Sequence, residues 1–250
     1  MMKGLLIPLV ALLLSGAVSA AEALRVGLSP DYPPLQYKQD GRVVGVEADN
    51  AKAVAEILGR PLAIFEFPFD ELIPALEQGR VDVIMSGLSV TAERGERVMF
   101  SNPYMQVGQM AIMHKDKLGR FSQPWSVFRE GVRVGVEPGT TGAAFAEREL
   151  GDAVVSFVAN EEAAFDALRK DRIDLYVHDA PTSWRLANDR NNPDMISLYA
   201  PLTNENLAWA VRLGEHKLLG ELNQALSLMR TNGTLSYILN RWIPVQIEVR

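Results

Sequence analysis

One short segment of the sequence, Thr91-Ala92-Glu93-Arg94, has the residue types and spacing of a site for a small anion. Thr91 is suited to cap a helix, and the free backbone N–H groups at a helix start favour a negative charge. Arg94 adds a planar fork of donors that matches a carboxylate in two parallel hydrogen bonds. The segment therefore predicts a carboxylate site, although a surface arginine in a short helix would have the same spacing.

A second pair of segments could complete such a site from elsewhere in the chain. Gly139-Thr140-Thr141 allows close approach to the backbone and leads into a predicted helix with free N–H donors. Asp179 follows a predicted strand and supplies an anion suited to an ammonium group. Both have simpler interpretations, the first as an ordinary capped turn and the second as the cap of a helix that begins near Pro181.

Two aromatic residues, Tyr32 and Phe69, lie at the edges of predicted loops and could stack on a flat or aliphatic part of a ligand. Packing in the core is the simpler alternative for each. The chain has no cysteine, which excludes disulfides, cysteine–zinc sites and thiol catalysis. No nucleophile motif, phosphate loop or metal-ligand cluster is recognisable, so we predict neither a cofactor nor a metal.

The elements that must position these residues form a weak internal repeat. The run from Leu24 to Pro30 recurs from Val132 to Pro138, and Arg80 to Ile84 is echoed by Arg172 to Tyr176. Each is a short β-type run, and helical periodicity fills the segments between them. Strands that alternate with helices predict parallel α/β sheets, and two halves with the same order of elements predict two similar lobes. In such sheets ligands bind beyond the carboxyl ends of strands, where the candidate segments lie.

The N-terminal residues have the three parts of a secretory signal peptide. Lys3 precedes an apolar run from Leu5 to Leu14, and small residues follow up to a predicted cleavage site after Ala20. An uncleaved anchor is the alternative, but the run is about half the length that spans a bilayer. Without cysteine there is no lipid-modified N-terminus, so the periplasm is the predicted compartment. The net charge of −6 argues against nucleic acid as a partner.

Across nearly the whole predicted mature chain, the sequence resembles the polar-amino-acid-binding family of bacterial extracellular solute-binding proteins, family 3. The matching stretches are Asp31 to Pro34, Gly45 to Asp49, Phe69 to Leu76, Gly79 to Ile84, Leu88 to Arg94, Phe100 to Tyr104, Gly139 to Thr141, and Asp179. The resemblance implies the α/β, two-lobed type II periplasmic-binding-protein fold, with a ligand cleft between lobes joined by two hinge strands. We expect one lobe from residues 21–108 with 208–250 and the other from 109–207, with crossings near 107–110 and 204–212.

The resemblance also implies a role for each candidate residue. Arg94 would receive the α-carboxylate of an amino acid, helped by Ser89 and by the Gly-Thr-Thr turn with Thr140 and Thr141. Asp179 would receive the α-ammonium, together with groups near Ser86 and Gly87. Tyr32 and Phe69 would sandwich the ligand side chain.

Two residues give opposite indications about the charge of the ligand side chain. Ser29 stands where family members specific for basic side chains often carry aspartate. Glu137 lies just before the Gly-Thr-Thr turn, where its charge would suit a cation. We expect a polar or cationic amino acid, with His178 packed at a strand end rather than touching the ligand.

By resemblance the protein is a monomer that delivers its ligand to a membrane ABC-type permease, and it is not an enzyme. Two alternatives stay open. Cyclohexadienyl dehydratases resemble this family, and Glu137 or His178 could serve as a general acid. A binding module that signals to a membrane receptor would have the same sequence features.

Overall fold

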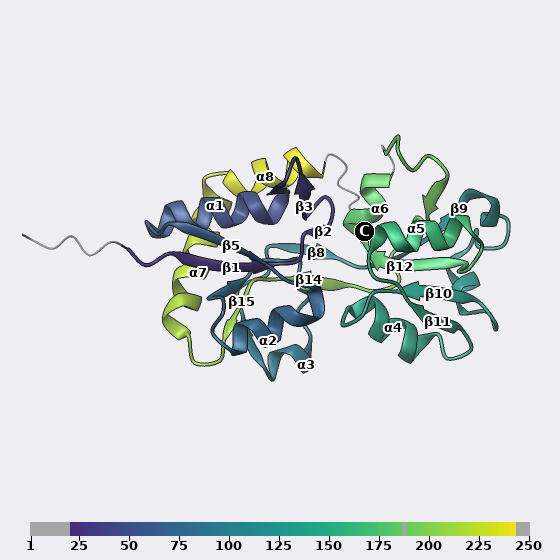
Figure 1. Ribbon diagram of the computed structural model, residues 1–250, viewed down its shortest axis with the longest axis horizontal. Helices are drawn as coiled ribbons and strands as arrows, with labels where there is room; N and C mark the ends of the chain where they lie inside the picture. The colour runs from purple at the N-terminus through teal and green to yellow at the C-terminus, as the bar shows by residue number, and fades with distance from the viewer. Residues whose placement is uncertain (1–20, 187–188, 244–250) are drawn as a thin grey trace, which may run out of the picture.

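The computed structural model describes residues 21–186 and 189–243, so the predicted signal peptide lies outside the described residues. Two α/β lobes lie end to end (Figure 1), each built on its own five-stranded sheet. Within the described ranges, no helix is long and apolar enough to cross a membrane.

The first lobe is built on a sheet with the strand order β5-β1-β6-β15-β7. Its strands are β1 (Leu24–Leu28), β5 (Leu62–Glu66), β6 (Val83–Ile84), β7 (Val98–Phe100) and β15 (Ala210–Arg212). The first three are parallel, and β15 runs antiparallel to both β6 and β7. A small sheet of β2 (Asp31–Tyr32), β3 (Gln36–Gln39) and β4 (Arg42–Val44) lies beside it.

Helices cover both faces of this first sheet. Their bounds are α1 (Val46–Leu58), α2 (Leu72–Glu77), α3 (Ala92–Gly95), α7 (His216–Thr231) and α8 (Thr234–Trp242). One apolar cluster joins the strands to α1, α7 and α8, whereas a separate cluster contains Leu72 and Leu76 of α2. Burial of these apolar faces is what holds helices against the sheet.

The second lobe repeats this plan with the strand order β11-β10-β12-β9-β13. Its strands are β9 (Gln109–His114), β10 (Arg133–Val136), β11 (Val154–Phe157), β12 (Leu175–Asp179) and β13 (Met195–Ser197). Its helices are α4 (Thr141–Glu149), α5 (Glu161–Arg169) and α6 (Ala180–Leu186). The clusters around Phe145 of α4 and Phe165 of α5 form two separate cores.

The predicted repeat is confirmed by the strand orders, since β5-β1-β6 and β11-β10-β12 are equivalent parallel trios. The same ion pair occurs in both. Asp82 accepts a hydrogen bond from the backbone N–H of Arg25 and pairs with its guanidinium, and Asp174 does the same for Arg133. Each aspartate thereby ties the segment before its strand to the neighbouring strand.

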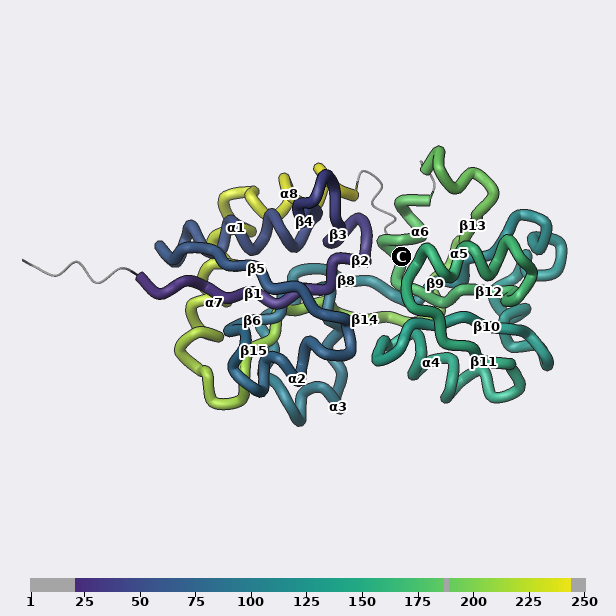
Figure 2. Tube along the Cα trace, in the orientation of Figure 1, coloured from purple at the N-terminus to yellow at the C-terminus, as the bar shows by residue number. Residues whose placement is uncertain are grey.

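A two-stranded ribbon of β8 (Met105–Val107) and β14 (Glu205–Leu207) lies where the chain passes between the lobes (Figure 2). Beyond it, the backbone N–H of Leu202 donates to the carbonyl of Gln109, which keeps the two connections together. Gly108 lies in the first connection, where a Cβ would come within 2.0 Å of the Thr203 carbonyl oxygen. The first connection lies within the predicted segment 107–110, whereas Leu202 and Thr203 of the second precede the predicted segment 204–212. The lobe boundaries stay a prediction.

Candidate ligand-binding cleft

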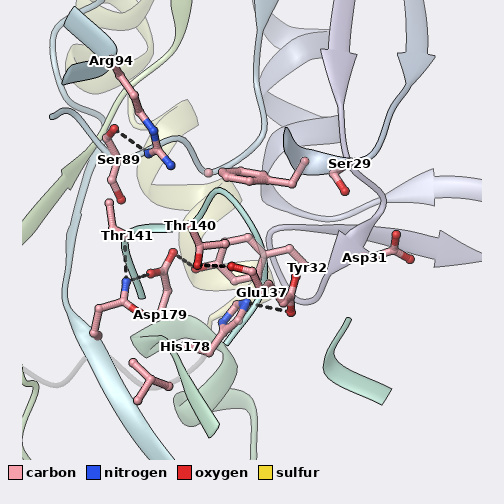
Figure 3. Close-up of a pocket in the computed structure, with 14 residues that line it drawn as sticks. Ser29, Asp31, Tyr32, Ser89, Arg94, Glu137, Thr140, Thr141, His178 and Asp179 are labelled. Atoms are coloured by element: carbon pink, nitrogen blue, oxygen red, sulfur yellow. Dashed lines mark hydrogen bonds and ion pairs between the residues drawn. The ribbon is translucent and has the colours of Figure 1, made fainter. Parts of the chain in front are cut away.

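A cavity lies between the two lobes and receives side chains from both (Figure 3). Its lining consists of Ser29, Asp31, Tyr32, Phe69, Gly87, Ser89, Arg94, Gln109, Glu137, Thr140, Thr141, Val177, His178 and Asp179. Nine of the ten predicted site residues are in this set, and Ser86 is the one that is not. As expected for parallel strands, several of them follow the carboxyl ends of β1, β10 and β12.

Arg94 reaches the cavity from α3 of the first lobe. Thr91 caps this helix, as predicted, by accepting a hydrogen bond from the Arg94 N–H at 3.1 Å. The guanidinium lies 5.5 Å from the centre of the Phe69 ring. Its Nη1 donates to the Ser89 carbonyl and its Nη2 to the Gly139 carbonyl, both at 2.9 Å. Because Gly139 belongs to the second lobe, Arg94 bridges the cleft.

Asp179 reaches the same cavity from the end of β12 in the second lobe. Its Oδ2 accepts a hydrogen bond from the Tyr32 hydroxyl of the first lobe at 2.7 Å, and its Oδ1 accepts one from Gln109 Nε2. Burial, and next the nearby carboxylate of Glu205, raise the pKa of Asp179 to about 7. A cation beside Asp179 would favour its ionised form.

The two threonines of the Gly-Thr-Thr turn have different functions. Thr140 caps α4 by accepting from the Ala143 N–H at 3.1 Å, and its hydroxyl donates to the Glu137 carbonyl at 2.7 Å. Its side chain is therefore engaged in forming the turn. The Thr141 hydroxyl accepts from Gln109 Nε2 at 3.0 Å and donates to Glu205 Oε2 at 2.6 Å.

Glu137 contacts two ring side chains of β12, Tyr176 and His178. The Tyr176 hydroxyl donates to Glu137 Oε1 at 2.5 Å, and His178 Nε2 lies 3.6 Å from the same oxygen. Burial raises the pKa of Glu137, while His178 and Tyr176 oppose the rise. Burial also lowers the pKa of His178, whose ring lies edge-on to Tyr32 at 4.8 Å between ring centres. His178 therefore lines the cavity instead of only packing at a strand end.

Ser86 lies behind the cavity wall, whereas Gly87 lines the cavity as the resemblance implied. Ser86 is fully buried, and its hydroxyl oxygen accepts from the Ser29 N–H at 2.9 Å and from Gln36 Nε2 at 3.1 Å, so it supports the wall from behind. Gly87 lines the cavity, but its N–H donates to Glu47 Oε1 at 2.9 Å. The Ser86 side chain is therefore buried behind the cavity wall, and the Gly87 N–H is engaged with Glu47.

Sequence reasoning missed four lining residues besides His178: Ser29, Asp31, Gln109 and Val177. Ser29 and Asp31 lie in the segment after a predicted strand, which the rule about strand ends includes, but neither was singled out as a ligand contact. Gln109 had a weaker signal, namely its position within the predicted crossing between lobes at 107–110. Its amide nitrogen lies within hydrogen-bonding distance of Asp179, Thr141 and Glu205, which gives it a central position in the site.

The arrangement offers a guanidinium on one lobe and a carboxylate on the other, with two further carboxylates, Asp31 and Glu137, in the same lining. It can therefore neutralise both ends of a zwitterion and accept an additional positive charge. Among the described residues, no group of three or more His, Asp and Glu side chains could hold a metal ion.

Comparison with known proteins agrees with the family resemblance of the sequence. The family model described as "Bacterial extracellular solute-binding proteins, family 3" matches residues 24–245. A relative in Escherichia coli (strain K12), named "ABC transporter arginine-binding protein 1", is 30% identical over 90% of this chain and 93% of its own.

Solved structures resemble this chain along most of its length. The structure titled "An ancestral arginine-binding protein bound to arginine" has a TM-score of 0.81 and 33% identity, covering 89% of this chain and 99% of that one. Another, "the ancestral amino acid-binding protein AncCDT-1, a precursor of cyclohexadienyl dehydratase", has a TM-score of 0.82 and 32% identity over 88% and 95%. The predicted type II fold is confirmed.

Proposed function

Because this chain belongs to the bacterial extracellular solute-binding proteins, family 3, we propose that it binds a cationic L-amino acid in the cleft and delivers it to an ABC-type membrane permease. The observation that carries the proposal is the facing of Arg94 and Asp179 from opposite lobes across one cavity. Arg94 binds the α-carboxylate as a fork, and Asp179 binds the α-ammonium. Tyr32 and Phe69 enclose the aliphatic part of the ligand between aromatic surfaces.

Glu137 supports a cationic side chain on the ligand. Once Arg94 and Asp179 have neutralised the α-groups, Glu137 is a further, largely buried carboxylate in the lining, and its raised pKa reflects the cost of keeping it charged there. His178 offsets this cost only in part, because burial lowers its own pKa. A guanidinium or ammonium at this position would pair with Glu137. Arginine is the first candidate, and it is the ligand named for two of the similar proteins described above.

Binding and closure are coupled in this mechanism. Only the closed form brings Arg94 and Asp179 to the same ligand, so ligand shifts the population towards closure about the β8–β14 ribbon. The closed form then differs in shape from the open form, which gives a permease a surface that distinguishes loaded from empty protein. We propose that the protein acts as a monomer in the periplasm after removal of its signal peptide.

We propose that the protein binds its ligand without catalysing a reaction. The structural resemblance to a protein titled as a precursor of a dehydratase makes one control worthwhile. Incubation with prephenate or arogenate should yield no aromatic product. Release of aromatic product that depends on Glu137 would support an enzyme instead.

A thermal-shift screen against the common L-amino acids, followed by calorimetry, tests the proposal. Ligand that binds the folded state alone raises the melting temperature by mass action. L-Arginine, L-lysine and L-ornithine should give the largest shifts, and neutral or acidic amino acids small ones. The largest shift with an acidic amino acid would contradict the assignment of Glu137, and no shift with any amino acid would contradict the function.

A further inference from the structure

Glu205 does not line the cavity, yet it contacts the hydroxyl groups that do. It begins β14 in the ribbon between the lobes. Leu207, also in β14, forms a β-bridge with Ser89, and the Val90 N–H donates to the Asn206 carbonyl at 2.8 Å. This extension of the ribbon brings Glu205 beside site residues from both lobes.

The carboxylate of Glu205 collects donors from several elements. It accepts from the Thr141 and Thr203 hydroxyls, both at 2.6 Å, and from Gln109 Nε2 at 3.2 Å. Burial tends to raise the pKa of Glu205, but hydrogen bonds from Thr141, Thr203, Ser89 and Gln109 lower it below the ordinary value for glutamate. Glu205 is therefore ionised and can only accept hydrogen bonds.

The ionised carboxylate of Glu205 fixes the direction in which the Thr141 hydroxyl donates. A hydroxyl has one hydrogen, and the hydrogen of Thr141 points to Glu205 because the carboxylate has none to give. A second site on the oxygen accepts from Gln109 Nε2. What Thr141 can still offer the cavity is a lone pair, so it can accept from an ammonium group but cannot donate to a carboxylate.

We propose that Glu205 is a positioning residue that holds the Thr141 hydroxyl as a hydrogen-bond acceptor, so that the site recognises the α-ammonium of its ligand through Thr141 as well as Asp179. The inference rests on the proposed function, because it assigns a donor to the same bound amino acid. It differs from the expectation that Thr141 helps Arg94 hold the α-carboxylate. It also means that the β8–β14 ribbon contributes to ligand selection through Glu205, which does not line the cavity.

The test compares L-arginine with δ-guanidinovalerate, which keeps the carboxylate and the guanidinium but lacks the α-ammonium. Calorimetry on the full mature chain gives the affinity ratio of the two for wild type, Glu205→Gln and Thr141→Val. We expect both variants to weaken L-arginine at least about tenfold while changing the affinity for δ-guanidinovalerate less than about threefold. The double variant should be no weaker than the worse single variant, because both changes remove the same interaction.

The matched control is Glu215→Gln, which alters a partly exposed glutamate that is paired with Arg212 at 2.9 Å and does not line the cavity, and it should leave both affinities unchanged. Melting curves establish that each variant is folded, and Thr141→Val tests the idea even if Glu205→Gln is not. If Thr141→Val weakens both ligands equally, the hydroxyl donates to the carboxylate and the inference is overturned. Failure of every amino acid to bind wild type would instead remove the proposed function, and the role of Glu205 with it.

Discussion

The Tyr32 hydroxyl of the first lobe donates a hydrogen bond to Asp179 Oδ2 of the second lobe at 2.7 Å. Both groups are buried, so the bond is shielded from water. Together with the bond from Arg94 to the Gly139 carbonyl, it fastens the lobes to each other on both sides of the cavity. Three of the residues proposed to bind the ligand, Tyr32, Asp179 and Arg94, therefore also hold the closed arrangement, which links affinity to the balance between open and closed forms.

Replacement Tyr32→Phe should open the ligand-free protein. It removes one hydrogen bond to a carboxylate, worth about 1.5–3 kcal/mol, and so lowers the ratio of closed to open molecules roughly tenfold or more. Small-angle X-ray scattering should give a larger radius of gyration for the ligand-free variant than for wild type. Saturating amino acid should return both to the same value. An unchanged radius without ligand would show that this bond does not hold the lobes together.

Replacement Arg94→Ala should weaken amino-acid binding by about 2–5 kcal/mol, which is some 30-fold to several thousandfold in affinity. The cause is a ligand carboxylate that stays buried without its charged partner. Arg97→Ala is the matched control, because Arg97 is exposed and pairs with Glu77 at 2.7 Å. Calorimetry should find the control within about twofold of wild type, and equal effects of the two changes would exclude Arg94 from the site.

Affinity should fall as the pH drops below about 7. The pKa of Asp179 is about 7 without ligand, whereas a bound ammonium favours the ionised form, so binding must expel a proton at lower pH. The dissociation constant should rise about tenfold for each pH unit below 7. The charged or titratable groups around Asp179 are Glu205, Arg94, Glu137, His178, Tyr32, Tyr104 and Tyr176. Calorimetry in buffers of different ionisation enthalpy should detect the released proton, and a flat profile from pH 5 to pH 8 would contradict the assignment.

The same pKa has a consequence for stability. Because the pKa of Asp179 is raised in the folded state, the folded protein holds this proton more tightly than the unfolded chain does, and its stability decreases as the pH rises from about 4 to 7. Asp179→Asn avoids this ionisation cost. At pH 8 we expect the ligand-free variant to be more stable than wild type by on the order of 1–2 kcal/mol in urea unfolding, although it binds amino acids poorly. A variant less stable than wild type at pH 8 would show that the charge of Asp179 is not costly there.

The repeat and the principal charged residues could be predicted because their signals are local. Short apolar runs stopped by proline mark β1 and β10, and polar residues directly after such strands point to one edge of a sheet. The matched ion pairs of Asp82 and Asp174 explain why the arginine and the aspartate recur in both halves. These features need only the order of residues along each strand.

Glu205, by contrast, could not be predicted, because its position depends on contacts distant in sequence. It lies 96 residues from Gln109 and 64 from Thr141, and the pairing of β14 with β8 brings it to both. Ser86 shows the opposite error. It follows a predicted strand like the true lining residues, but Ser29 and Gln36 occupy its hydroxyl oxygen from behind. A pattern along the chain gives the end of a strand without giving the direction of each side chain there.

Glu47 should be the residue whose loss most weakens the first lobe. It is fully buried, and its carboxylate accepts hydrogen bonds from the Gly87 N–H at 2.9 Å, Tyr104 hydroxyl at 2.8 Å, Trp209 Nε1 at 3.1 Å and Asn50 Nδ2 at 3.3 Å. Glu47→Ala leaves these donors unpaired in the core, so we expect a loss of about 3–5 kcal/mol in the free energy of unfolding. Glu56→Ala, at an exposed position of the same helix α1, should change it by less than about 0.5 kcal/mol. Urea unfolding measures both, and similar values would mean that the buried carboxylate is not what holds Tyr104 and Trp209, just before β8 and β15, to α1.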